Sequence, residues 1–323
     1  MWKTVVRRIL IMIPQLIALS LFAFILAEFM PGDPLTGIMA DTPGLTPERI
    51  AEIRAIHGLD DPWPVRYGRW IRGMFRGDFG LSLQFQLPIL EVVGPRLVNT
   101  LRLSFLALII LYGISVPFGI LAGRYNGKTV EKLISGYVYF GMAMPAIVLS
   151  FFLIWFFGFI LGWFPMSGTW SVEAELQGGI AVFLSQIHHM ILPALAMSLT
   201  GSVGIVQFLK SEIVDSRESD YVLTIRSKGA PAGVIYNKHI LRNSILPMVN
   251  GIGFAVTGLL SGTVIIERIF GYNGMGRLFI DLIVLRDFSI VIFLIVFYGF
   301  LAVIGGLISD IALMLFDPRI RIE

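Results

Sequence analysis

The chain of 323 residues is 56% hydrophobic and 15% charged, with a mean hydropathy of +0.80. Soluble domains carry about 25% charged residues, so this composition excludes an ordinary soluble protein and indicates an integral membrane protein. The net charge of +3 gives no reason to expect a nucleic-acid partner, and the absence of cysteine excludes disulfides and thiolate metal sites.

Six apolar segments are long enough to cross a bilayer, whose hydrocarbon core of about 30 Å takes roughly 20 helical residues. The sequence therefore predicts an all-α integral membrane protein with six transmembrane helices. The predicted spans cover residues 9–29, 99–122, 133–160, 187–209, 244–266 and 289–315. The first apolar run is longer than the roughly 7–15 residues of a signal-peptide core, and no clear cleavage site follows it. We interpret it as an uncleaved anchor.

The segment between the first two spans begins with the turn cluster Pro31–Pro34 and is predicted to contain two short helices. The first is expected to start at Thr46, with Pro47 at its first position, and to end at Gly58. The second covers residues 65–75 and places three arginines near one face. It fits either an interfacial helix with its arginines near lipid phosphate or a docking surface for an external partner, and this alternative stays open.

Lys and Arg concentrate at the N-terminus, in the loop after the second span and in a polar segment that runs from Lys210 to Arg242. The loop over residues 162–186 has Glu173 and Glu175 but no Lys or Arg. Cytoplasmic loops carry the excess of Lys and Arg, so both termini and the polar segment are predicted to be cytoplasmic. The expected location is the cytoplasmic membrane, with several passes.

The polar segment is too charged to enter a bilayer and too short to form a separate domain. Its pattern predicts a helix from Asp220 to Lys228, a stop at Gly229, a turn at Ala230–Pro231 and a second helix. We call this helix–turn–helix arrangement the corner. It is expected to be stiff, so a force applied to it would be transmitted to the fourth and fifth spans. We interpret the polar segment as a binding site for another protein.

Polar side chains also recur at helical spacing inside the fourth and fifth spans. In a lipid environment such groups need a partner or a water-filled cavity. They therefore predict either a substrate path or hydrogen bonds between helices, and for any single residue both interpretations stay open. The candidate path residues are Ser198, Ser202, Asn250, Thr257 and Ser261.

No catalytic or metal site is predicted. Gly127–Thr129 is similar to the end of a phosphate-binding loop, but Ala122 stands where the first glycine of that loop is required. His188 and His189 have no further ligand at a suitable spacing. No ionisable residue lies deep in a span, which argues against a proton- or sodium-coupled carrier, the main alternative class. A membrane-embedded enzyme is a more distant alternative.

A series of short motifs runs in order along the whole chain. They are Pro31–Pro34, Gly58–Pro62, Gly77–Ser82, Pro95–Leu101, Asp220–Val222, Thr224–Gly229, His239, Leu241–Ser244, Leu246–Pro247, Phe270–Gly276, Arg286–Asp287 and Asp317–Arg319. Together they resemble the oligopeptide, dipeptide and nickel branch of the binding-protein-dependent ABC importer permeases. Two departures stand out. Leu223–Ile225 replaces the family's glutamate–alanine–alanine core, and Asn273 replaces a usual proline, which puts the geometry of that turn in doubt.

The resemblance implies a type I ABC importer permease fold, with a cytoplasmic coupling helix between the fourth and fifth spans. It implies a first region over residues 1–96, a permease domain over 97–316 that contains the coupling segment 210–243, and a tail over 317–323. The implied ATPase-coupling residues are Asp220, Tyr221, Thr224, Arg226, Lys228 and Gly229.

The resemblance also implies a function as the transmembrane permease subunit of an ATP-driven importer of oligopeptides or dipeptides. Nickel or another small solute is the alternative substrate. The expected partners are a second homologous permease, two cytoplasmic ATPase subunits, an extracytoplasmic peptide-binding protein and membrane lipid. The chain is expected to be non-catalytic and to hold no cofactor, because ATP and Mg²⁺ would bind to the partner ATPases.

Overall fold

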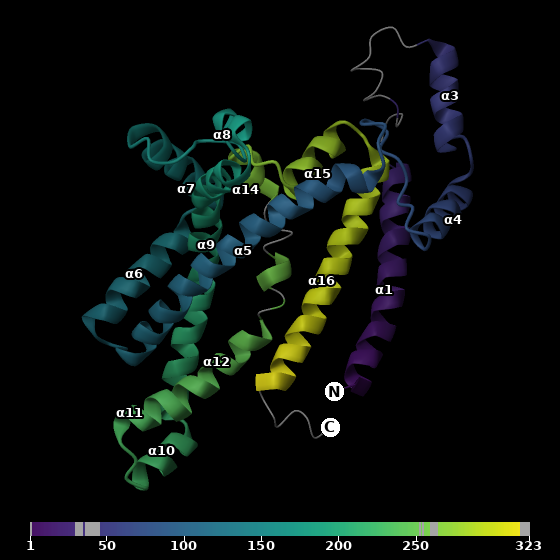
Figure 1. Ribbon diagram of the computed structural model, residues 1–323. Helices are drawn as coiled ribbons and strands as arrows, with labels where there is room; N and C mark the ends of the chain where they lie inside the picture. Colours follow the sequence, from purple (N-terminus) through teal and green to yellow (C-terminus); the bar gives the residue numbers. More distant parts are fainter. Residues whose placement is uncertain are drawn as a thin grey trace. The chain divides into compact units, whose positions relative to one another are not determined.

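A computed structural model describes residues 2–29, 35, 46–251, 253, 255–258 and 264–316, and within these residues the regular structure is helical (Figure 1). The chain forms two compact units. The small unit consists of Trp2–Thr100 and Asn273–Val303, and the large unit of Leu101–Tyr272 and the described residues from Ile304 to Phe316. Two long helices, α5 (Ile89–Arg124) and α16 (Phe288–Phe316), contribute residues to both units.

The small unit contains α1 (Trp2–Phe29), α3 (Pro47–His57), α4 (Trp63–Met74) and α15 (Met275–Val284), together with the first parts of α5 and α16. Buried side chains of α5, α15 and α16 form its main core. A second cluster joins α1 to α16, with Ala23, Phe24 and Ile292 at its centre. The Tyr67 and Trp70 rings of α4 pack against this cluster, which fixes α4 beside the C-terminal end of α1.

The two short helices predicted between the first spans are confirmed. Thr46 caps α3 by accepting the N–H of Arg49, and Pro47 occupies the first helical position. Gly58 ends the helix with a φ of +59°, a left-handed conformation that favours glycine. The predicted helix over 65–75 is α4, which begins two residues earlier. The turn cluster Pro31–Pro34 lies outside the described residues.

The large unit is built around α9 (Gly179–Glu218), which contacts α6 (Thr129–Ala143), α7 (Ala146–Leu153), α12 (Leu241–Asn250) and α14 (Val264–Ile269). Its other elements are η1 (Ile154–Ile160), α8 (Val172–Gln177), α10 (Asp220–Ser227), α11 (Ala232–Val234) and η2 (Ile235–Ile240), of which η1 and η2 are π-helical. Because α9 is covered on several sides, residues along most of its length are buried, from Met190 to Ile213.

Four of the described helices are long and apolar enough to cross a membrane. They are Val6–Phe29, Ile89–Arg124, Gly179–Glu218 and Phe288–Leu315, and they confirm the predicted helical runs over 9–29, 99–122, 187–209 and 289–315. The predicted span 244–266 includes residues outside the described part of the chain, so the count of six stays a prediction. The predicted boundary between residues 96 and 97 falls inside α5 and is likewise a prediction.

The predicted span over 133–160 is not one continuous helix, and its place as a single span stays a prediction. The segment forms α6 and then α7 with η1, and the two parts are bent by 103° at Met144 and Pro145. Proline has no backbone N–H and disfavours the helical conformation of the residue before it. Met144 accordingly adopts φ −95° and ψ 114°, an extended conformation that ends α6.

Glycines bring α5 and α9 unusually close in the large unit. A Cβ atom on Gly119 would lie 2.9 Å from Leu209 Cβ, and one on Gly123 would lie 2.7 Å from Ile213 Cβ. Small residues four positions apart allow membrane helices to approach closely and gain van der Waals contact. The C-terminal parts of α5 and α9 therefore pack closely against each other at these two glycines.

We expect Gly123→Ala to lower the free energy of unfolding by about 1–3 kcal/mol, because the added methyl group overlaps Ile213. Gly113→Ala in the same helix is the control, since nothing lies within 4 Å of the added atom. The control should be neutral or stabilising by up to about 1 kcal/mol. Thermal unfolding of the purified variants in detergent measures both effects, and equal destabilisation of the two would contradict the close approach.

Candidate functional site

The polar segment folds as a helix, a glycine turn and a second helix, as predicted. The first helix is α10 (Asp220–Ser227), and the chain leaves it through Lys228 and Gly229, whose φ is +76°. Pro231 then caps the next helical stretch, which runs through α11, η2 and α12 without a gap. Figure 1 shows α10 and α11 side by side at the end of the large unit. The local signals Gly229 and Pro231 were sufficient to place this corner.

Apolar packing holds the corner against α9. Val222 of α10 and Ile235 and Ile240 of η2 are buried against Leu209 and Ile213 of α9. Ile213 is the same residue that meets Gly123 of α5. Burying side chains of this size stabilises a packed state by about 1.5–3 kcal/mol each. The polar segment is therefore a packed extension of α9 and not a loose loop.

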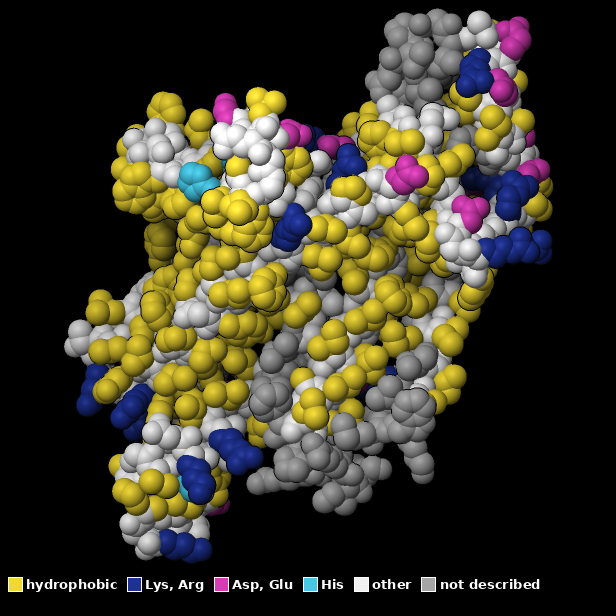
Figure 2. Space-filling view, viewed as in Figure 1, with side chains coloured by type: hydrophobic (Ala, Val, Ile, Leu, Met, Phe, Trp, Pro, Cys, Tyr) yellow, Lys and Arg dark blue, Asp and Glu magenta, His cyan; other side chains and the backbone are white. Residues whose placement is uncertain are grey.

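The opposite face of α10 is open. Leu223 is 52% exposed, and Thr224, Arg226, Lys228 and Gly229 are exposed beside it. Asp220 is also exposed and begins the helix, whereas Tyr221 is only partly exposed. Figure 2 shows basic side chains gathered over this end of the large unit. The structure thus brings the predicted coupling residues together on one short helix with a free, partly basic face.

A serine fastens the second helix of the corner to α9. The Ser244 hydroxyl lies 3.1 Å from the Glu212 carbonyl oxygen and 3.0 Å from Ser216 Oγ. Ser244 itself is fully buried in α12. A buried hydroxyl needs such partners, because an unpaired one costs about 1–3 kcal/mol. These contacts fix the start of α12 relative to the last turns of α9.

A tyrosine fastens the corner to α5. The Tyr236 hydroxyl donates to the Ile120 carbonyl oxygen over 3.1 Å, and the Arg124 guanidinium lies 5.1 Å from the centre of the Tyr236 ring. Arg217 of α9 adds a bond of 3.3 Å to the Gly123 carbonyl oxygen. Burial raises the pKa of the Tyr236 hydroxyl, so it stays a neutral donor at physiological pH. The sequence interpretation had connected the corner only to the fourth and fifth spans, and it missed this contact with the second.

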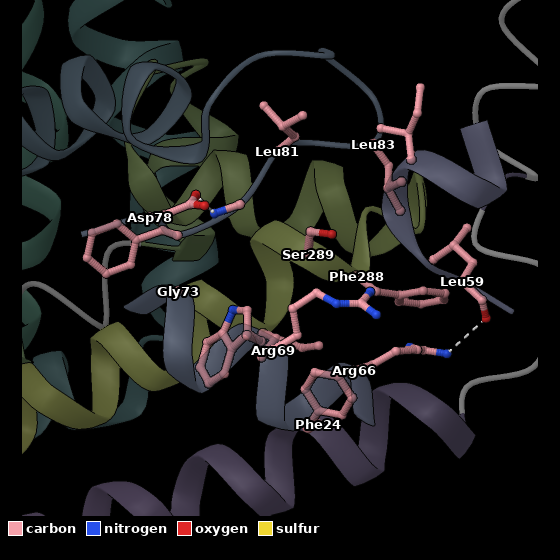
Figure 3. Close-up of a pocket in the computed structure, with 15 residues that line it drawn as sticks. Phe24, Leu59, Arg66, Arg69, Gly73, Asp78, Leu81, Leu83, Phe288 and Ser289 are labelled. Atoms are coloured by element: carbon pink, nitrogen blue, oxygen red, sulfur yellow. Dashed lines mark hydrogen bonds between the residues drawn. The ribbon is translucent and has the colours of Figure 1, made fainter. Parts of the chain in front are cut away.

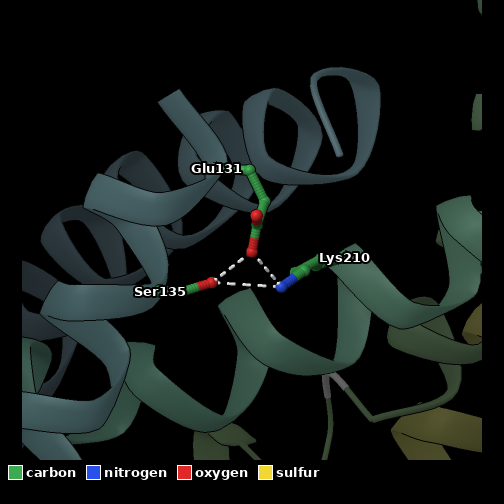
Figure 4. A network of polar contacts seen from close by, with 3 residues as sticks. All are labelled: Glu131, Ser135 and Lys210. Atoms are coloured by element: carbon green, nitrogen blue, oxygen red, sulfur yellow. Dashed lines mark hydrogen bonds and ion pairs between the residues drawn. The ribbon is translucent and has the colours of Figure 1, made fainter. Parts of the chain in front are cut away.

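An ion pair joins α6 to α9 at the first residue of the polar segment (Figure 4). Lys210 Nζ and Ser135 Oγ both donate to Glu131 Oε1, and Lys210 Nζ lies 3.0 Å from Ser135 Oγ. The Lys210 and Glu131 side chains are only 18% and 13% exposed. Charged hydrogen bonds at this degree of burial are stronger than those at an open surface. No sequence motif had drawn attention to this network.

The predicted path residues in α9 are buried and paired within the chain. Ser198 Oγ lies 2.8 Å from the Ala107 carbonyl oxygen of α5 and 2.6 Å from the Ala194 carbonyl oxygen. Ser202 Oγ forms a hydrogen bond with the Tyr137 hydroxyl of α6. These hydroxyls therefore bond between helices in this structure, and their role along a path stays a prediction.

The predicted path residues near the fifth span are less completely described. The Thr257 hydroxyl donates to the Gly253 carbonyl oxygen over 3.1 Å, and its Cγ2 lies close to Gly305 of α16. Asn250 ends α12, but its side chain is outside the described residues, as is Ser261 as a whole. The role of Asn250, Thr257 and Ser261 along a path stays a prediction.

Two sequence motifs of the small unit meet through a buried aspartate. Asp287 Oδ2 accepts the Ser82 hydroxyl over 2.5 Å and the Gln84 N–H over 3.0 Å. Its Oδ1 accepts the N–H of Ile290 and so caps α16. The carboxylate is 1% exposed. The buried Asp287 carboxylate therefore holds the motif at Gly77–Ser82 against the start of α16.

A second pair of motifs meets at the turn where Asn273 replaces a usual proline. Asn99 Nδ2 donates to the Asn273 carbonyl oxygen over 2.9 Å, and Thr100 Oγ1 accepts the N–H of Met275 over 2.8 Å. The Asn99 bond uses the backbone carbonyl of residue 273, which asparagine and proline both possess. The replacement therefore preserves this contact.

Comparison with known proteins identifies the family. The family of binding-protein-dependent transport system inner membrane components matches residues 115–322, and its N-terminal membrane-component domain matches residues 1–104. The chain belongs to this family and is a membrane component of a binding-protein-dependent transport system.

Full-length relatives and a solved structure agree with that assignment. The chain is 33% identical over 318 residues to the oligopeptide transport system permease protein AppB of Bacillus subtilis, with 98% of each chain covered. It is 31% identical over 337 residues to the dipeptide transport system permease protein DppB of Escherichia coli K12, with 99% of each covered. A structure of the MetNI methionine ABC transporter shares the fold, with a TM-score of 0.55 and 14% identity over 71% of this chain and 97% of the other.

We expect Lys210→Ala to destabilise the large unit by about 1–3 kcal/mol, because Glu131 then keeps a half-satisfied, largely buried charge. The double variant Glu131→Ala with Lys210→Ala should cost less than the sum of the two single changes. Lys132→Ala, at an exposed neighbouring position, should change the stability by no more than about 0.5 kcal/mol. Thermal unfolding of the wild type, the two single variants and the double variant measures the coupling between Lys210 and Glu131, and strict additivity would contradict it.

Proposed function

We propose that this chain is the permease subunit of an ATP-driven importer that carries oligopeptides or dipeptides across the cytoplasmic membrane. The observation that carries the proposal is the end-to-end similarity to AppB and DppB, named as oligopeptide and dipeptide permeases. The helix α10 supports the proposal, because it is exposed on one face and packed firmly against α9 on the other. A permease that is driven by another subunit needs such a rigid, accessible binding surface for that subunit.

We propose that the chain assembles with a second homologous permease, two cytoplasmic ATPase subunits and an extracytoplasmic peptide-binding protein. The exposed face of α10, with Asp220, Thr224, Arg226 and Lys228, would rest in a cleft of one ATPase. ATP and Mg²⁺ would be held by the ATPases, and this chain would be non-catalytic. Both termini and the polar segment would then lie on the cytoplasmic side.

The proposed mechanism transmits ATPase closure through the corner. A displacement of α10 moves α9 through the packing of Val222 against Leu209 and Ile213. The Ser244 contacts carry the same displacement into α12, and the Tyr236 contact carries it into α5. Three helices therefore move together when one short helix is displaced. Opening of a path along the fourth and fifth spans, with Ser198, Ser202, Asn250, Thr257 and Ser261, would follow.

Single-cysteine crosslinking tests the proposed partner and orientation, since the chain has no cysteine of its own. Thr224→Cys places a thiol on the exposed face of α10, and Glu175→Cys places one on α8, on the opposite side in the predicted topology. We expect a short bifunctional reagent to join Thr224→Cys, but not Glu175→Cys, to an ATPase subunit in native membranes. A crosslink from Glu175→Cys alone would overturn the orientation, and none from either would overturn the coupling role.

Substitution of Gly229 tests the transmission step. Gly229 has a φ of +76° and open space around its Cβ position, so Gly229→Val strains the backbone by about 1–2 kcal/mol without a clash. We expect assembly to persist while peptide uptake per ATP hydrolysed falls. Gly233→Val is the control, because Gly233 lies in α11 with equally open space and no left-handed backbone. Uptake of labelled peptide into proteoliposomes gives the readout, and normal coupling in Gly229→Val would contradict the role.

A further inference from the structure

The small unit contains a cavity that neither the family nor the proposed transport cycle explains. It has a volume of about 320 Å³ and lies between α1, α4, residues 78–83 and the start of α16 (Figure 3). Phe24, Trp70, Phe288 and Ile292 provide apolar surface, while Arg66, Arg69 and Asp78 provide charge. A site of this composition suits a ligand that has both an apolar part and a charged part.

The two arginines retain donors for an anion. Arg66 NH2 lies 3.1 Å from Glu28 Oε2, and its NH1 donates to the Leu59 carbonyl oxygen over 3.5 Å. The Arg66 guanidinium lies 5.7 Å from the centre of the Phe24 ring. Arg69 pairs with Asp61 through NH2. A guanidinium group has five N–H donors, so each pair uses only part of the set. Figure 3 shows Arg66 and Arg69 extending from α4 in the same direction, and planar guanidinium groups are well suited to binding phosphate.

The apolar walls belong to helices that can cross a membrane. Phe24 lies near the C-terminal end of α1, and Ile292 lies near the N-terminal end of α16. On α1 the apolar side chains Phe22, Leu26 and Phe29 are 59%, 47% and 80% exposed, and helical periodicity places them on the face of α1 away from Phe24. The cavity is therefore placed where the ends of membrane helices meet a surface helix, the level of lipid headgroups.

A carboxylate in the cavity wall restricts the charge of the ligand. Asp78 Oδ1 accepts the N–H of Gly80 over 2.9 Å, which fixes the side chain in the wall. Its negative charge opposes a ligand with net negative charge and favours one that also carries an ammonium group. The Trp70 ring lies in the same wall and contributes apolar surface beside the charged groups.

We propose that this cavity binds a glycerophospholipid with an amine headgroup, of the phosphatidylethanolamine type. The phosphate contacts Arg66 and Arg69, the ammonium group faces Asp78, and the start of an acyl chain packs against Phe24 and Ile292. The proposal rests on the membrane insertion of α1 and α16 and is independent of which side of the membrane this end of the chain faces. A segment of an external protein is the competing occupant.

Lipid retention by the intact transport assembly tests the site. The assembly is purified from native membranes in mild detergent, and its bound phospholipids are counted by native mass spectrometry. We expect Arg69→Gln to reduce retained phosphatidylethanolamine by about tenfold, the loss that corresponds to one charged hydrogen bond. Arg72→Gln removes the same charge from an exposed position on α4 outside the cavity lining and should leave retention unchanged. Equal retention by both variants would overturn the site.

A second variant tests the headgroup. Asp78→Asn keeps an acceptor for the Gly80 N–H and removes only the charge. In vesicles with equal amounts of phosphatidylethanolamine and phosphatidylglycerol, the wild-type assembly should retain the former preferentially, and Asp78→Asn should lose this preference. An unchanged preference would overturn the role of Asp78. Displacement of the lipid by inorganic phosphate alone would show an anion site and overturn the lipid proposal.

The two proposals fail separately. If the lipid site is wrong, Arg69→Gln and Arg72→Gln retain lipid equally, while the Thr224→Cys crosslink to the ATPase is unaffected. If the proposed function is wrong, the crosslink is absent, while differential lipid retention can still be measured on the purified chain. Binding of an added peptide from the external partner, in competition with retained lipid, would assign the cavity to protein docking instead.

Discussion

The close approach of α5 and α9 is the constraint on which the large unit depends. Gly119 and Gly123 leave no room for a side-chain carbon, so Leu209 and Ile213 lie directly against the α5 backbone. Ile213 is also part of the cluster that buries Val222 of α10. The same contact region therefore sets the distance between α5 and α9 and provides the surface against which α10 packs. Because Ile213 takes part in both contacts, a displacement of α10 also disturbs the packing between α5 and α9.

Polar contacts extend this constraint to the remaining helices. Tyr236 and Arg217 join the end of α5, Ser244 joins α12 to α9, and Lys210 joins α6 to α9. Each bond uses a buried or half-buried group whose partner is far away in sequence, which makes its loss costly. The short helix α10 has one apolar face packed against α9 and one polar face left open, which is the arrangement that the proposed coupling role needs.

Much of the fold could be predicted because its signals are local. Long apolar runs indicated four of the membrane helices, and Thr46, Gly58, Gly229 and Pro231 indicated helix ends by conformational preferences that act within a few residues. The bend at Met144 was missed even though Pro145 is a local signal, because the hydrophobic run continues across it without interruption. Apolar length measures whether a segment can enter a bilayer and says little about its direction within it.

The sequence by itself determined that this is a helical membrane protein, that a stiff polar corner interrupts its spans, and which family it resembles. Only the tertiary structure decided which side chains meet. Ser198 and Ser202 had two open interpretations, and their partners Ala107 and Tyr137 became identifiable only once α5, α6 and α9 were placed. The physical reason is that helical periodicity specifies the face a residue occupies, whereas the neighbour of that face is set by packing of segments many residues apart.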